Sequence, residues 1–341
     1  MKKLLLTKFT IFAAAAIVVL ASCKSETRYI TASSGRSGEV VVVINTDIWN
    51  SKTGESVRQI LTETDTLLPQ PEAKFSLINI PHQQFTNLFK SNRNIVFVQI
   101  DKNKTECEIS SKTDVYATPQ TIVYIIGSDE DQIVKALQKR SNKVLEIFET
   151  AELERVKANA KAFEDADLRA LVENKYGYSL YFPQDYELFG DKNEFMWIGL
   201  RTTKRTQGVL IYSYPYTNKE QLSLDSLIAK RDEILQHYVL LDKEPEGSAY
   251  MTTSNYLDPA YSTMKINDEF FVRVRGLWEI KNDFMGGPFV SYTTIDKAKN
   301  MVITFEGFVY SPSSTKRDLM RQLEGIVIAA KPMKSEKSIV E

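Results

Sequence analysis

Apolar residues follow two different patterns along the chain, and the pattern changes near residue 128. Before it, short runs of β-branched and aromatic residues alternate with polar segments; the clearest runs are VVVVI at 40–44 and IVFVQI at 95–100. Unbroken apolar runs of this length are typical of strands covered on both faces. Helical spacing over 55–64 follows the first run. We therefore expect an α/β sandwich domain over residues 40–150.

A helical pattern begins at residue 128, and neither glycine nor proline occurs between Gly127 and Gly177. Apolar residues recur there at the spacing of one helix face, and the sequence becomes heavily charged over 152–169. We expect one long or twice-bent helix whose later part, 151–175, bridges two domains. The alternative, a partner-binding coiled coil, needs three or four sustained heptads.

The second region, 176–332, alternates apolar and polar residues between turn signals. Its clearest strand covers 270–280, where Val272 and Trp278 point to one side while Arg273, Arg275 and Glu279 point to the other. This alternation predicts one buried and one solvated face.

Helices are expected at 222–238 and from residue 315, and residues 333–341 form a disordered tail. The predicted fold class is thus α+β, with two domains that are each a mostly antiparallel sheet with packed helices, joined by a long charged helix.

The first 23 residues have the organisation of an export signal. Three lysines precede an apolar run of about a dozen residues, which is too short for a membrane-spanning helix of about 20. Leu20-Ala21-Ser22-Cys23 then resembles a bacterial lipobox, which implies a signal peptide at 1–22 and lipid attachment at Cys23. The alternative is an ordinary signal peptide with an incidental cysteine.

The lipobox also implies a location in the cell envelope. Two or three acyl chains anchor a protein stably, and residues 23–39, rich in Ser and Thr, form a flexible tether. Lys24, with no acidic run after it, favours the outer membrane, facing the periplasm.

Charge and motifs exclude several function classes. The chain has a net charge of −1, which becomes −4 without the three lysines of the signal, so a nucleic-acid partner is not expected. Zinc-ligand spacings, phosphate loops and nucleophile elbows are absent from the sequence, so we assign no cofactor, metal or catalytic residue. Cys107 is the second of the two cysteines in the chain, and we interpret it as a small buried hydrophobic residue.

One stretch, 273–292, has the composition of a binding surface. Two glycines and a proline allow close backbone approach, and aromatic and charged residues flank them. The candidate ligand or partner surface consists of Arg275, Trp278, Glu279, Asp283, Phe284, Gly286 and Gly287. The alternative is a hairpin loop whose aromatic residues belong to the core.

The segments GLWEIKNDFMGGPF (276–289), EGFVYSP (306–312) and KRDLMRQLEGI (316–326) resemble an uncharacterised lipoprotein family of the Bacteroidota, domain of unknown function 4837. The resemblance extends over nearly the whole chain after the signal. It implies an envelope lipoprotein and no known activity.

The favoured function is therefore a noncatalytic envelope lipoprotein that binds or scaffolds a periplasmic component through its second domain, with a possible protein partner. The alternative is an envelope hydrolase that uses paired carboxylates among Glu279, Asp283 and Glu306, which requires two of them about 5 to 10 Å apart in a cleft.

Overall fold

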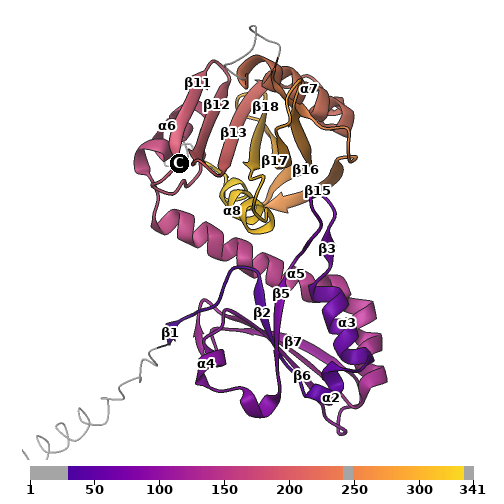
Figure 1. Ribbon diagram of the computed structural model, residues 1–341. Coiled ribbons are helices and arrows are strands. Elements are labelled where there is room, and N and C mark those ends of the chain that lie inside the picture. The colour runs from indigo at the N-terminus through magenta and orange to yellow at the C-terminus, as the bar shows by residue number, and fades with distance from the viewer. Residues whose placement is uncertain (1–29, 241–248, 334–341) are drawn as a thin grey trace, which may run out of the picture.

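The computed structural model describes residues 30–240 and 249–333, and Figure 1 shows two domains stacked end to end. The N-terminal domain is built on a five-stranded sheet and the C-terminal domain on an eight-stranded sheet. The long helix α5 (Glu130–Ala162) lies between them and packs against α8 (Arg317–Val327) of the C-terminal domain. The expected two-domain α+β architecture is confirmed.

The N-terminal sheet has the strand order β5-β2-β6-β9-β7. Its strands are β2 (Glu39–Val43), β5 (Ser76–Ile80), β6 (Asn94–Ile100), β7 (Glu108–Thr113) and β9 (Thr121–Gly127). All run parallel to their neighbours except β7, which is antiparallel to β9. The prediction of a mostly antiparallel sheet in each domain is wrong here, because helical crossovers after β2 and β5 return the chain in the same direction.

Both faces of this sheet are covered, as the apolar runs predicted. On one face, α3 (Lys52–Leu61) and the first part of α5 pack on Val40 and Val42. On the other, Phe85 and Phe89 pack on Val41 and Val43. The remaining short elements are β1 (Thr31–Ala32), α2 (Thr46–Trp49), β3 (Thr64–Asp65), β4 (Glu72–Ala73), η1 (His82–Gln84), α4 (Asn87–Lys90) and β8 (Ala117–Thr118).

The helical region is divided into two helices. Asp129 caps α5 by accepting a hydrogen bond from the Gln132 backbone at 2.9 Å, so the helix begins close to residue 128, where the helical pattern starts. The region predicted as one bridging helix, 151–175, breaks where Asp165 caps α6 (Ala166–Tyr176). Since α6 contributes to the C-terminal core, only α5 spans the two domains. No helix in the described ranges has both the length and the apolar character needed to cross a membrane.

The C-terminal sheet is antiparallel throughout, as predicted, in the order β11-β12-β13-β18-β17-β16-β14, and β15 also pairs with β16. Its strands are β11 (Glu187–Lys192), β12 (Phe195–Arg201), β13 (Thr206–Pro215), β14 (Met251–Thr253), β15 (Ala260–Ile266), β16 (Glu269–Ile280), β17 (Gly286–Asp296) and β18 (Met301–Tyr310). Beside it lie β10 (Tyr178–Ser179), η2 (Lys219–Leu222), α7 (Leu224–Tyr238) and β19 (Lys331–Pro332).

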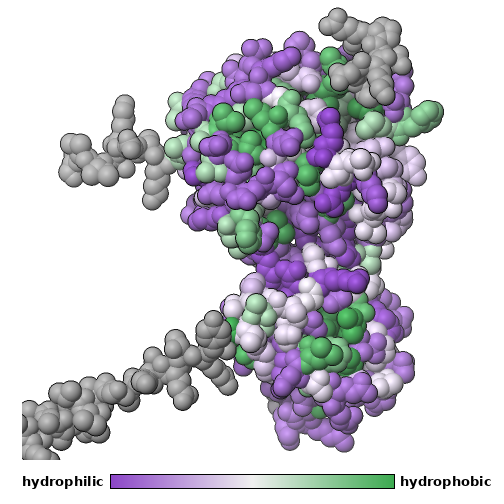
Figure 2. Space-filling view, turned by 60° about the vertical axis from the view of Figure 1, so that its left-hand side comes forward, coloured by the Kyte–Doolittle hydropathy of each residue, from purple (hydrophilic) through white to green (hydrophobic). Residues whose placement is uncertain are grey.

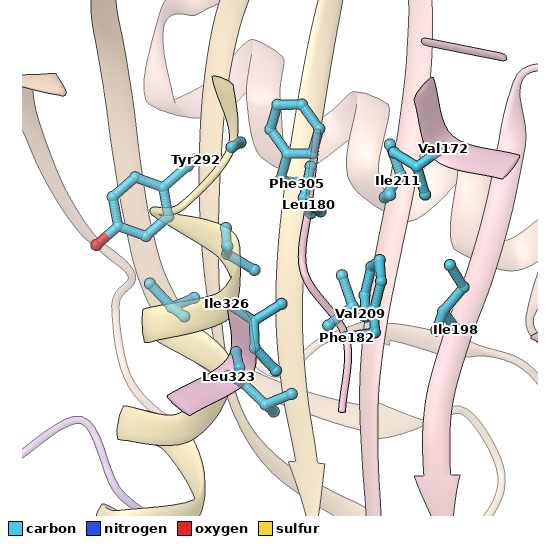
Figure 3. Close-up of a cluster of buried hydrophobic side chains, with 14 of the residues drawn as sticks. Val172, Leu180, Phe182, Ile198, Val209, Ile211, Tyr292, Phe305, Leu323 and Ile326 are labelled. Atoms are coloured by element: carbon cyan, nitrogen blue, oxygen red, sulfur yellow. The ribbon is translucent and has the colours of Figure 1, made fainter. Parts of the chain in front are cut away.

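Helices bury both faces of this sheet. One face packs on α6 and α8, and Figure 3 shows Leu323 and Ile326 of α8 approaching Tyr292 and Phe305 of the strands. The other face packs on α7, where Trp278 and other strand residues form a second cluster. The predicted solvated face of β16 is therefore wrong, because α8 and the N-terminal domain cover it.

The domains meet through a hairpin and a helix crossing. The hairpin of β3 and β4 reaches from the N-terminal domain to α8, where the Glu72 carboxylate accepts from the Lys316 and Arg317 backbones at 2.7 and 3.0 Å. At the crossing, a Cβ on Gly325 would lie 2.4 Å from Val156 of α5, so glycine permits the close approach. Figure 2 shows a narrow, mostly hydrophilic neck at this junction.

One buried carboxylate at the junction makes stability depend on pH. Burial alone would raise the pKa of Glu324, but Arg273 and Arg275 outweigh it, Tyr292 donates a hydrogen bond at 2.5 Å, and the pKa is held below its ordinary value. A lowered pKa stabilises the fold above the unfolded value of about 4.3, and this stabilisation is lost as the pH falls through the folded value.

We therefore expect Glu324→Gln to lower the free energy of unfolding by about 1–3 kcal/mol at pH 7, with a difference that shrinks below about pH 4. Urea unfolding of both proteins across this pH range measures it. An equal difference at every pH would contradict the charge-based explanation.

Candidate functional site

The predicted surface at 273–292 is mostly structural. Trp278 is 2% exposed, and its indole Nε1–H donates to the Val309 carbonyl at 3.2 Å. A Cβ on Gly287 would lie 2.0 Å from that same carbonyl oxygen, and one on Gly286 would lie 2.9 Å from the Trp278 carbonyl oxygen. The glycines therefore allow strands to approach each other, and the tryptophan belongs to the core.

The other residues of that surface lie in different places. Arg275 forms an ion pair with Asp65 of the N-terminal domain at 2.5 Å, so it belongs to the domain junction. Glu279 is half-buried on β16 opposite Gly286. In the turn that follows, Asp283 accepts from the Met285 backbone at 3.0 Å, and Phe284 is fully exposed. The seven residues therefore do not line one pocket.

Among the three carboxylates of the hydrolase hypothesis, Glu306 is separated from the other two. Glu306 is wholly buried under α7 and pairs with Arg231, whereas Asp283 is exposed in a turn. In the sheet, Glu306 of β18 pairs with Ser291 of β17, which in turn pairs with Val274 of β16. Val274 lies five residues along β16 from Glu279. At about 3.3 Å per residue this offset is roughly 16 Å along the strand, so these two carboxylates are too far apart to act as a pair.

The remaining sequence candidates for chemistry are buried or dispersed. Cys107 is 8% exposed in the N-terminal core, and burial raises the pKa of its thiol, which confirms its interpretation as a small hydrophobe. Within residues 30–240 and 249–333, no three His, Cys, Asp or Glu side chains gather in a way that would hold a metal ion.

A groove in the N-terminal domain is the best candidate for a site. It has a volume of about 620 Å³ and lies between one face of α5 and the outer part of the sheet, formed by β7 and the start of β9. A volume in this range is ordinary for a ligand pocket. The α5 wall presents Ile147, Ala151 and Ala158, which are small or apolar, whereas β7 presents the hydroxyls of Ser111 and Thr113.

Arg155 forms the floor of this groove and is held rigidly. Its Nη1 donates to the Asn94 Oδ1 at 2.8 Å and the Glu152 Oε1 at 2.9 Å, while Nη2 donates to the Arg93 carbonyl at 2.8 Å and the Thr121 Oγ1 at 3.2 Å. The side chain is 6% exposed. These four hydrogen bonds leave one guanidinium donor, Nε–H, which is buried without a partner among the described residues.

A buried donor without a hydrogen-bond partner costs about 1–3 kcal/mol of stability, so the lack of a partner for Nε–H needs an explanation. Burial lowers the pKa of Arg155, while the adjacent Glu152 opposes this, and the guanidinium remains charged at neutral pH because arginine starts above 12. The Nε atom has almost no accessible surface, so a ligand oxygen could accept from Nε–H only after the side chains around it had moved. Arg155 therefore acts mainly as a rigid, charged support beneath the groove.

The wall opposite α5 ends in a free sheet edge. β7 is the last strand of the sheet on this side and has six residues. Alternate residues of an edge strand turn their N–H and C=O groups outward, where another extended chain can pair with them. The groove therefore combines an edge strand, a helix wall and a buried donor.

This site was not predicted from the sequence, because the charged stretch at 152–169 was interpreted as part of a helix that bridges the two domains. A local signal was present. The buried stripe of α5 runs through Leu137, Val144 and Phe148, and Glu152 and Arg155 continue it at spacings of four and three. Charged residues at core positions of an amphipathic helix indicate a buried polar network, and here that network forms the groove floor.

Comparison with known families separates the two domains. Residues 165–329 match the family described as Domain of unknown function (DUF4837), as the C-terminal segments predicted. The match is narrower than expected, since residues 33–161 match a different family, Domain of unknown function (DUF8532). No curated protein matches the chain.

Proposed function

We propose that this chain, in which a DUF8532 domain precedes a DUF4837 domain, is a noncatalytic, lipid-anchored protein of the cell envelope. It binds an extended segment of a partner protein in the groove between β7 and α5. The observation that supports this most strongly is the position of the groove, which lies between α5 and β7, the last strand of the sheet on that side.

The anchor part of the proposal rests on the sequence. The lipobox-like Leu20-Ala21-Ser22-Cys23 lies outside the described residues. Residue 30 is seven steps along the chain from Cys23, and a fully extended chain of that length spans at most about 25 Å. The N-terminal domain, which contains the groove, therefore stays close to the membrane surface, which we propose to be the periplasmic face of the outer membrane.

The groove part rests on a known mode of recognition. Extended peptides bind between an edge strand and a helix by adding a strand to the sheet, so that backbone hydrogen bonds give affinity and alternate side chains enter pockets. Ser111 and Thr113, two residues apart on β7, both face the groove. The backbone of the peptide would then form hydrogen bonds with the free edge of β7.

The anchor is tested by Cys23→Ala. Without the thiol no lipid is attached, so we expect the protein to move from the membrane fraction to the soluble periplasmic fraction in cell fractionation. Retention of the variant in the membrane pellet after a carbonate wash would contradict the lipid anchor.

The groove is tested by crosslinking in cells. With a photoreactive amino acid at Ser111, we expect crosslinks to one peptide segment of a partner, identified by mass spectrometry. Ala158→Trp fills the groove from an exposed position and should abolish them, whereas Asn159→Trp, exposed but outside the groove, should not. Ile78 on the opposite edge strand β5 is the control position for the photoreactive residue.

Equal crosslinking from Ser111 and Ile78, or no effect of Ala158→Trp, would contradict the proposal. The crosslinking and fractionation results are independent, so that either part of the proposed function can fail alone.

A further inference from the structure

Three polar residues lie in one row at the carboxyl edge of the N-terminal sheet. Val43 of β2 pairs with Ile80 of β5 and with Phe97 of β6, so these three parallel strands are in register. Two residues beyond them along each strand are Asn45, His82 and Gln99.

The backbone keeps these three side chains on one face. It remains extended at Asn45, with φ −63° and ψ 147°, and at Pro81, with φ −68° and ψ 153°, while Gln99 is still within β6. Since side chains alternate along extended chains, the polar row shares the face of Val43, Ile80 and Phe97. The chain order thus places polar groups from three distant segments side by side.

This row lies where the strand order reverses. From β2 the chain moves outward to β5, and from β6 it moves outward to β9 in the opposite direction. Loops that leave in opposite directions open a crevice beyond the carboxyl ends of the strands, which is where ligands of open α/β sheets bind. A cavity of about 500 Å³ is present at this position, and it is separate from the Arg155 groove.

The cavity is lined by side chains with unused hydrogen-bonding groups. Besides the row, Asp47 and Gln83 face it, and within the described chain none of the side chains of Asn45, Asp47, Gln83 and Gln99 makes a hydrogen bond. Three of these four are primary amides, which present a donor and an acceptor side by side.

His82 is oriented by two contacts. Its Nε2–H donates to the Val98 carbonyl at 3.0 Å, and its ring stacks on Phe97 at 6.3 Å and 29°. With the Nε2 proton used in this way, Nδ1 is the ring nitrogen that can face a ligand. Ile48 and Ile100 add apolar surface beside these polar groups.

We propose that this carboxyl-edge pocket binds a neutral sugar. Adjacent hydroxyls of a sugar ring each donate and accept, which matches three amides, one carboxylate and one imidazole acceptor, while the C–H face of the ring packs on the isoleucines. Among the residues that the structure describes, no lysine or arginine lines the pocket, and Asp47 contributes a negative charge, so a phosphate or other anion is disfavoured. The proposal is independent of the function assigned to the groove.

Saturation-transfer NMR on the full mature chain tests it, with glucose, galactose, mannose and N-acetylglucosamine as probes and inorganic phosphate as a competitor. We expect transfer to the ring protons of at least one sugar, and no displacement by phosphate. Asn45→Ala combined with Gln99→Ala should weaken binding by about tenfold or more, as expected for the loss of two hydrogen bonds. Both residues are exposed, so the fold should be retained.

Gln84→Ala, an exposed glutamine next to the pocket but outside its lining, is the matched control. Ala158→Trp in the groove should leave sugar binding unchanged, which separates the two sites. Absence of transfer to all four sugars, displacement by phosphate, or equal binding by the double variant and the control would each overturn the proposal.

Discussion

Replacing Glu306 with alanine is expected to lower the free energy of unfolding by about 3–5 kcal/mol. Glu306 and Arg231 are 0% and 2% exposed, and their groups meet in a bidentate pair, with Nε to Oε2 at 2.9 Å and Nη2 to Oε1 at 2.7 Å. The guanidinium also lies 3.8 Å from the centroid of the Phe289 ring. Removal of the carboxylate leaves the buried cation with Asp232, 3.4 Å away and 30% exposed, as its remaining carboxylate partner, and the loss of the buried bidentate pair is the cause of the large effect.

Urea unfolding of two further variants tests this prediction: one replaces both members of the buried pair, and the other breaks an exposed pair. Arg231→Met combined with Glu306→Leu should recover most of the lost stability, because a buried pair replaced by apolar residues of similar volume is often neutral. Lys230 and Glu233 form an exposed pair on the same helix at 2.6 Å. Glu233→Ala should cost less than about 1 kcal/mol. A Glu306→Ala loss as small as that of Glu233→Ala would contradict the importance of burial.

Leu68→Ala is expected to cost about 2–5 kcal/mol, and mainly to destabilise the domain that does not contain it. Leu68 comes from the β3–β4 hairpin of the N-terminal domain, yet it is 3% exposed within the core cluster of the C-terminal domain. Truncation removes buried apolar contact and leaves a cavity in that core. We expect unfolding of the C-terminal domain at a lower temperature and weaker coupling between the domains.

Hydrogen exchange followed by mass spectrometry measures where protection is lost. In the Leu68→Ala variant, exchange should increase in the hairpin and in α8, while the N-terminal sheet stays protected. Leu67→Ala, at a half-buried neighbouring position, should have a smaller effect. If exchange increased only in the N-terminal sheet, Leu68 would not link the domains in the way that its burial indicates.

Elements with a strong local pattern were predicted well from the sequence. The apolar runs at 40–44 and 95–100 form β2 and β6 with both faces covered, and the helical pattern that begins at residue 128 forms α5. The start of α8 shows the limit of such patterns. A helix was expected from residue 315, but the side chain of its N-cap residue, Lys316, makes no capping hydrogen bond. The cap is Glu72, 244 residues away in the sequence from Lys316.

The surroundings of the candidate surface residues could not be predicted either, because their partners also lie far away in the sequence. Arg273 and Arg275 alternate with apolar residues as on a solvated face, and only α8 and the hairpin bring Glu324 and Asp65 to them. Trp278 and Gly287 have the composition of a ligand surface, but their neighbour is the Val309 carbonyl of another strand. A local pattern of residues does not indicate which other strand will lie next to it, or how close that strand will be.

By itself, the sequence determined the α+β class, the two-domain division, the covered strands and the burial of Cys107, because hydrophobic periodicity and length act locally. It also predicted export and lipid attachment at Cys23. The tertiary structure decided the parallel order of the N-terminal sheet, the junction through Leu68, and the two pockets around Arg155 and His82. These depend on which distant segments become neighbours, and crossover direction and helix packing settle that only when the whole chain folds.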